Sequence, residues 1–165
     1  MIRDEIDFIE AQEYNLVRNM PMQNQEFDAM TKASGEGQIH EWVVSFLQTS
    51  GKNHRLAEKL SENSTFHYGP VNYPIANLVN LIETDPHYYE DPLTTEQKLD
   101  AMIESLDKGW NPVPIITTNL WNDGLWIADG CHRQMMLKRK GITTFPVIFY
   151  FRDQASLDSF VQSIG

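Results

Sequence analysis

The segment IADGCHRQ, residues 127–134, holds the residue types and spacing that most strongly suggest chemistry. An apolar run ends at Asp129, Gly130 permits a sharp turn, and polar residues open the next segment, as at a strand-to-helix junction. Backbone N–H groups at a helix N-terminus are unpaired, and a glycine there lets a phosphate approach closely. Arg133 in the first turn can hold a phosphate with two hydrogen bonds. The spacing predicts an anion site; the alternative is a turn whose His132 and Arg133 make only surface hydrogen bonds.

Cys131 lies inside this turn, between Gly130 and His132. A thiol at a helix N-terminus, beside a histidine and an arginine, is expected to have a lowered pKa and to act as a nucleophile. The sequence contains one cysteine, so no internal disulfide can form, and this is typical of a protein from the reducing cytoplasm.

The first part of the chain that must position this turn, residues 1–64, is predicted to be helical. Its apolar residues recur at helical spacing and predict helices up to about Met20, over 39–47 and over 53–62, with a polar connection at 22–34. We expect these helices to form an N-terminal extension packed on the rest of the protein. The alternative is a helical arm that binds a partner protein.

The second part, residues 65–165, is predicted to be a mixed α/β domain. Prolines and β-branched residues predict extended segments, and Asp-Gly between two apolar runs predicts a hairpin turn. The expected strands are 73–78, 114–120, 125–128 and 143–151, and the expected helices are 94–108, 131–140 and 156–164.

The composition is that of a globular protein with an acidic surface. The chain has 165 residues, 41% of them hydrophobic, and a formal net charge of −10. This charge repels phosphate backbones and argues against a nucleic-acid partner. No apolar run approaches the roughly 18 residues of a membrane span, and the acidic N-terminus does not resemble a signal peptide. We therefore expect a cytoplasmic protein without a membrane partner.

The stretch from Leu99 to Tyr150 combines these features in a specific order: a helix ended by Gly109, a proline-bearing strand, a hairpin, the Asp-Gly-x-His-Arg turn into a helix, Gly141, and a closing strand with Pro146. This order resembles the core of the ParB/sulfiredoxin-like superfamily, with weaker similarity back to about Tyr73. The resemblance covers about half of the chain. It implies an α/β (α+β) domain with a small mixed sheet and flanking helices, preceded here by the N-terminal helical segment.

The resemblance also implies that the domain binds a nucleotide, ATP or ADP, with its phosphates held at the turn by Gly130, Cys131, His132 and Arg133. This role requires the Arg133 guanidinium to face outward. Members similar to sulfiredoxin present a lysine and hydroxyls from the preceding helix, where Lys98 matches the lysine and Ser105 a hydroxyl. Positions 98 and 105 share one helical face, so the geometry permits both roles. The alternative for Lys98 is a solvated surface lysine.

Members of the superfamily use the nucleotide differently. Sulfiredoxins reduce a protein sulfinic acid with the cysteine of Gly-Cys-His-Arg, which Cys131 matches, although they carry a glycine in place of Asp129. Kinase members, which phosphorylate free serine, read Asp-Gly-His-x-Arg or similar and match Asp129-Gly130. DNA-partitioning members have a Gly-x-Arg-Arg turn and a helix-turn-helix domain, neither of which is expected in this acidic chain.

We therefore expect a nucleotide-dependent phosphotransferase, of kinase type, or a hydrolase, acting on an unidentified acceptor substrate. Asp129 is the expected Mg²⁺ ligand or nucleophile-orienting residue. The kinase resemblance implies a base from the acidic loop before the Lys98 helix, and Glu90 and Glu83 are the candidates. The alternatives are a sulfiredoxin-like reductase using Cys131, and a non-catalytic regulatory module whose N-terminal helices bind a protein.

Other candidates for chemistry have weaker signals. His40, His54 and His67 show no metal-ligand spacing, so the sequence gives little support for a zinc site. The tryptophans around the expected hairpin are predicted to pack in the core, with stacking on a ligand as the alternative: Trp110, Trp121 and Trp126.

Overall fold

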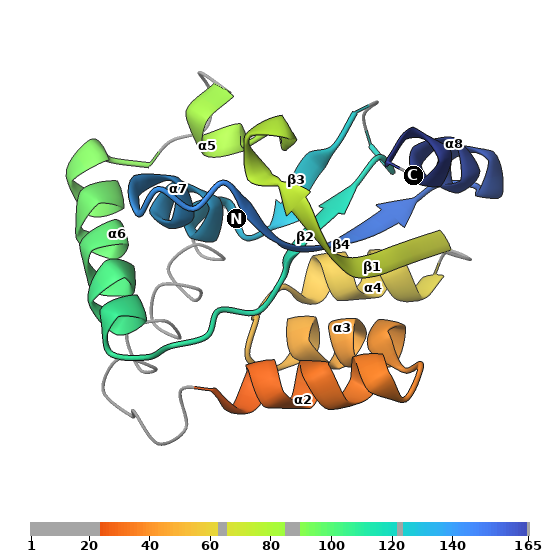
Figure 1. The fold of residues 1–165 in the computed structure, drawn as a ribbon, viewed down its shortest axis with the longest axis horizontal. Helices are drawn as coiled ribbons and strands as arrows, with labels where there is room; N and C mark the ends of the chain where they lie inside the picture. The colour runs from red at the N-terminus through yellow and green to blue at the C-terminus, as the bar shows by residue number, and fades with distance from the viewer. Residues whose placement is uncertain (1–23, 63–65, 85–89, 122–123, 165) are drawn as a thin grey trace.

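The computed structural model describes residues 24–62, 66–84, 90–121 and 124–164. Within them the chain forms a mixed α/β fold with a four-stranded sheet in the order β1-β4-β2-β3 (Figure 1). The predicted α/β class is therefore confirmed. The helix expected up to Met20 lies outside the described residues.

The sheet combines antiparallel and parallel pairs. Its strands are β1 (Phe66–Pro74), β2 (Ile115–Thr118), β3 (Trp126–Asp129) and β4 (Thr144–Phe151). β1 pairs with β4 and β2 with β3 in antiparallel fashion, whereas β2 and β4 run parallel. The antiparallel β2–β3 pair confirms the predicted hairpin, whose turn residues 122 and 123 lie outside the described part of the chain.

The central strand β4 is covered on both faces. Because successive side chains of a strand point to opposite faces, Val147, Phe149 and Phe151 enter one hydrophobic core. Ile148 and Tyr150 enter the other. The sheet thus lies between two layers of helices, as Figure 1 shows.

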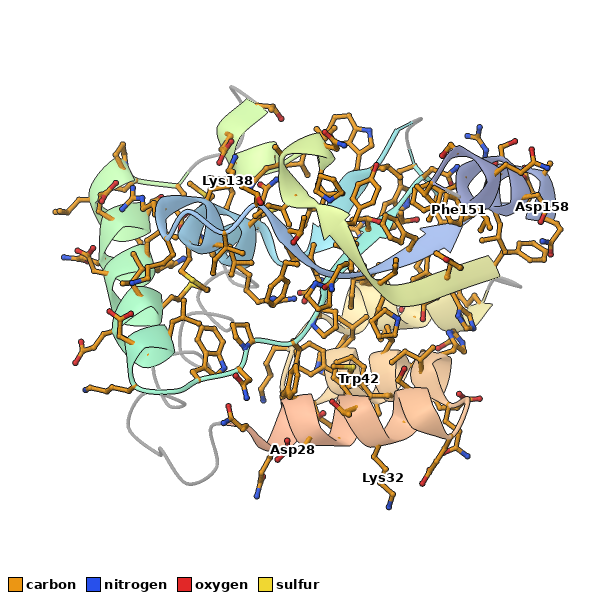
Figure 2. All side chains as sticks on the ribbon, in the orientation of Figure 1. Asp28, Lys32, Trp42, Lys138, Phe151 and Asp158 are labelled. Carbon is orange, nitrogen blue, oxygen red and sulfur yellow. The ribbon has the colours of Figure 1, made fainter. Side chains whose placement is uncertain are left out.

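The helices α2 (Gln25–Gly35), α3 (Ile39–Gln48) and α4 (His54–Glu62) form the layer on the Ile148 face. The predicted apolar stripe of α3 is buried and includes Trp42 and Leu47. Asp28 and Lys32 lie on the outer side of α2, away from the sheet (Figure 2). The prediction of a polar connection at 22–34 is wrong, because most of this segment is helix α2; Met30 is the one residue of α2 that is buried.

On the other face lie the remaining helices and a 3-10 turn. They are η2 (Ile75–Asn77), α5 (Leu81–Thr84), α6 (Pro92–Asp107), α7 (Cys131–Arg139) and α8 (Gln154–Ile164). Helix α7, which begins at the Asp-Gly-x-His-Arg turn, packs against α6 and η2, whereas α8 packs on β1 and β4. The extended segment expected at 73–78 is wrong in its bounds, because strand β1 starts at Phe66 and a short 3-10 turn follows it. Within the described residues, no helix has the length and apolar character to cross a membrane.

Candidate active site

Helix α7 begins immediately after β3, as the strand–glycine–helix pattern predicts. Gly130 is the residue between them and has a φ of 115°, a left-handed conformation that favours glycine. A Cβ added to Gly130 would lie 2.9 Å from Nη2 of Arg133. The glycine therefore makes room for an arginine of the same chain.

Arg133 points back along α7 and forms a buried ion pair with Asp129. Its Nη2 lies 3.0 Å from Oδ2 of Asp129 and donates to the carbonyl oxygen of Pro114 at 3.1 Å. The two side chains are only 6% and 3% exposed. The expectation of an outward-facing guanidinium is therefore wrong. The Nε–H of Arg133 is also buried, and it has no hydrogen-bond partner among the described residues.

The same ion pair decides how Asp129 can act. One of its carboxylate oxygens is held by Arg133, and a cation competes poorly for an oxygen that already accepts from a guanidinium. Among the described residues, no three His, Cys, Asp or Glu side chains gather closely enough to bind a metal ion. Arg133 would thus compete with a cation for Asp129, and the Mg²⁺ site expected there stays a prediction.

Beside this pair, Glu90, Lys98 and His132 form a buried polar cluster. Glu90 precedes α6, Lys98 lies within α6, and His132 lies in the first turn of α7. Oε1 of Glu90 is 2.5 Å from Nζ of Lys98, and Oε2 is 2.8 Å from Nε2 of His132. Lys98 is therefore not the solvated surface lysine of the alternative interpretation. Three residues expected at one site thus meet from two helices and a preceding loop.

The environment of Glu90 keeps its carboxylate ionised. Burial on its own would raise the pKa of Glu90, but hydrogen bonds from His132, Lys98 and Thr95 outweigh it and lower the pKa to about 2. Oε2 of Glu90 also accepts from the Thr95 hydroxyl at 2.8 Å. A carboxylate this acidic is a poor proton acceptor near neutral pH, so Glu90 is better suited to orienting its partners than to the expected role of general base.

His132 is the member of the cluster that can exchange a proton. Its Nε2 faces both oxygens of Glu90, at 3.0 and 2.8 Å. No hydrogen bond links its Nδ1 to the residues that the structure describes. A carboxylate that fixes one ring nitrogen orients the imidazole and leaves the other nitrogen available to a substrate, as in catalytic triads.

The surroundings of the Cys131 thiol disfavour its ionised form, although the residue is partly exposed. Burial raises its pKa to about 12, and the negative charge of Asp129 acts in the same direction. The backbone N–H groups of Leu81 and Ile82 oppose this effect without outweighing it. The expectation of a lowered pKa is therefore wrong, because desolvation of the thiolate exceeds the help that it receives from the helix N-terminus.

A buried amide pair that the sequence analysis did not single out holds α7 in place. Asn80 Nδ2 donates to the carbonyl oxygen of Cys131 at 3.0 Å and to Oε1 of Gln134 at 2.8 Å. Nε2 of Gln134 in turn donates to the backbone oxygens of Ile75 and Leu78. These bonds connect the first turns of α7 to the segment before α5. The local sequence carries no signal for such a long-range pair.

The remaining predicted residues lie apart from this cluster or in the core. Glu83, the other candidate base, forms a surface ion pair with Lys138 at 3.1 Å. Ser105 is buried on α6, two turns beyond Lys98. Of the three tryptophans, Trp110 is buried in the core and Trp126 is partly buried, whereas Trp121 is 54% exposed.

Comparisons with known proteins identify no relative of this chain. No protein-family model, curated protein or solved structure matches this chain. The contacts around the start of α7 therefore carry the functional argument by themselves.

Proposed function

We propose that the protein is an ATP- or ADP-binding enzyme, similar to the ParB/sulfiredoxin-like superfamily, that transfers or hydrolyses a phosphoryl group at the start of α7. The observation that carries this proposal is the meeting of Glu90, Lys98 and His132 in one buried cluster. Buried groups of opposite charge beside a helix N-terminus are typical of functional sites, since they are costly for folding alone.

One feature of α7 fits a phosphate group. Its N-cap residue, Gly130, provides no side-chain hydrogen bond to the first turn, and the backbone N–H groups of a first turn have no partner within their own helix. Arg133 faces inward and pairs with Asp129, so it is not assigned to the phosphates. The groups that would hold the phosphates are therefore the backbone amides of the first turn.

The cluster supplies orientation, charge and a proton-exchanging group. Glu90 holds His132 through Nε2, so that Nδ1 is the nitrogen that gives or takes a proton at the substrate. Lys98 adds the positive charge that phosphoryl transfer requires near the phosphates. Asp129 is assigned to holding Arg133, and no Mg²⁺ ligand is assigned among the described residues.

The sulfiredoxin-like alternative receives no support from the environment of Cys131. Reduction of a sulfinic acid in that chemistry needs a nucleophilic thiolate, and burial raises the pKa of Cys131 to about 12. Replacement of Cys131 by serine is therefore expected to leave the proposed activity largely intact.

Nucleotide binding tests the proposal directly. We expect ATP or ADP, with or without Mg²⁺, to raise the melting temperature of the protein, because a ligand that binds only the folded state stabilises it. Lys98→Met should abolish this shift. Lys108→Met is the matched control, since Lys108 follows the same helix but forms an exposed ion pair with Glu104.

Product analysis tests the chemistry separately from binding. His132→Gln should retain nucleotide binding and lose turnover by about 10²–10⁴-fold, the contribution typical of a general acid or base. Circular dichroism of each variant establishes that it folds. The absence of a thermal shift with every nucleotide tested would overturn the proposal and favour a non-catalytic protein-binding module.

A further inference from the structure

A second cluster of ionisable rings lies on the opposite face of the sheet. His40 in the first turn of α3 stacks on His67 of β1, with ring centroids 5.6 Å apart and planes within 9°. Tyr150 of β4 completes the group: its hydroxyl lies 3.0 Å from Nδ1 of His40, and its ring centroid lies 5.7 Å from that of His67. Three elements distant in sequence thus meet through three rings.

This cluster joins the helical layer to the β1–β4 pair. His67 and Tyr150 are direct partners in the antiparallel register, whereas His40 comes from helix α3, in the helical layer that covers this face of the sheet. Tyr150 belongs to the core that α2–α4 form with the sheet. Helix α7 contributes to the core on the other face, so this cluster is separate from that of Glu90.

The Tyr150 hydroxyl can adapt to either charge state of His40. Burial raises the pKa of Tyr150 far above its ordinary value, so the hydroxyl stays neutral. A neutral hydroxyl donates to an unprotonated Nδ1 and accepts from a protonated one. The contact between His40 and Tyr150 therefore survives protonation of His40.

The neighbours of His67 favour its neutral form on balance. Desolvation lowers the pKa of His67 first, and the facing His40 lowers it further, while Glu41 of α3 opposes them. Two protonated imidazoles stacked face to face repel each other, because they carry the same charge at a short distance. Within the part of the chain that the structure describes, the titratable groups facing His67 are His40 and Glu41 from α3 and Tyr150 from β4.

We propose that the stacked His40–His67 pair is an acid-sensitive contact, which holds α3 against β1 when neutral and loosens the helical layer when both rings are protonated. His67 is exposed, and the fold lowers its pKa relative to the unfolded chain, so His67 favours the folded state above the pKa of the unfolded chain. This stability is lost as the pH falls through about 6.5, the ordinary histidine value.

The test is the pH dependence of unfolding in the wild type and in His67→Gln, with urea as denaturant. Between pH 7.5 and 5 the unfolding equilibrium constant of the wild type should rise more than that of the variant, because protonation favours the unfolded chain when the fold lowers the pKa of His67. The exposure of His67 keeps this difference small. His54→Gln, at the start of α4 and outside the cluster, should behave as the wild type.

Two further measurements distinguish the contact from a general acid effect. Nuclear magnetic resonance should show the His67 ring titrating below the ordinary value in the wild type and closer to it in His40→Gln. Hydrogen exchange, corrected for intrinsic rates, should accelerate at pH 5 in α3 but not in α6. Identical pH profiles for the wild type and His67→Gln, or a His67 titration at its ordinary value in the wild type, would overturn the proposal.

Discussion

Gly130 and Arg133 share one small volume at the start of α7. A Cβ on residue 130 would lie 2.9 Å from Nη2 and 3.1 Å from Cζ of the arginine, and 3.2 Å from Cγ1 of Ile115. Both the lack of room for a Cβ and the left-handed backbone conformation therefore require glycine at position 130. The glycine and arginine of the turn depend on each other before any ligand is considered.

Gly130→Ala should destabilise the protein by roughly 2–4 kcal/mol. The change adds the cost of a left-handed alanine to displacement of a buried guanidinium. Gly109→Ala is the matched control, because Gly109 has a φ of 101° and nothing within 4 Å of an added Cβ. Urea unfolding would measure both, and equal losses would show that Arg133 does not occupy the space beside Gly130.

Glu90→Gln should cost roughly 3–5 kcal/mol, the range for breaking a buried ion pair from one side. The pKa of Glu90 falls from 4.5 to about 2 on folding, so its contribution is complete above pH 4.5 and is lost as the pH falls toward 2. Unfolding measured across this range should show a weaker acid dependence in the variant than in the wild type.

The control for this variant is Glu104→Gln. Glu104 forms an exposed ion pair with Lys108, so its replacement should leave the unfolding free energy close to the wild type. A similarly small loss in Glu90→Gln would mean that the cluster does not form in solution.

Cys131 should react slowly with iodoacetamide in the native protein. With a pKa of about 12, the thiolate fraction at pH 8 is far below that of a thiol at the ordinary value of 9.0. We expect alkylation at least about 100-fold slower in the native state than in urea, because the thiolate is the reacting form. Mass spectrometry measures both rates, and rapid native alkylation would restore the thiol-enzyme hypothesis.

Asn80→Ala should destabilise the protein by roughly 1–3 kcal/mol and reduce protection of the first turn of α7 in hydrogen exchange. The change leaves the Cys131 carbonyl and the Gln134 amide oxygen without their donor. Asn77→Ala, at an exposed position of the same segment, provides the comparison. Loss of stability without any change in α7 would place the effect of Asn80 elsewhere.

The sequence predicted elements well where one periodic signal dominates. The apolar stripe of α3, the strand β4 and the β2–β3 hairpin match their patterns because each buries a regular set of side chains. Helix α2 was missed because its buried face is reduced to Met30. The start of β1 was missed because Gly69 and Pro70 interrupt the strand pattern, at the irregular register between Tyr68 and Val71.

For the candidate site, residue types were predictable but side-chain directions were not. Spacing and resemblance selected Lys98 and His132 and left Glu90 and Glu83 as alternatives. Of these two, Glu90 meets Lys98 and His132 in the structure. The inward direction of Arg133 had a signal that was not used: an opposite charge, Asp129, stands four residues before it. Such a pair competes with any ligand for the same guanidinium.

Coverage of β4 on both sides has a consequence for how the protein can be divided. A fragment confined to residues 65–165 would present Ile116, Ile148 and Tyr150 to water, since these side chains pack against α2–α4. Such a bare apolar sheet invites aggregation with further copies. The change of sequence pattern near residue 65 therefore does not separate two domains that fold independently. Calorimetry of the whole chain should show a single unfolding transition.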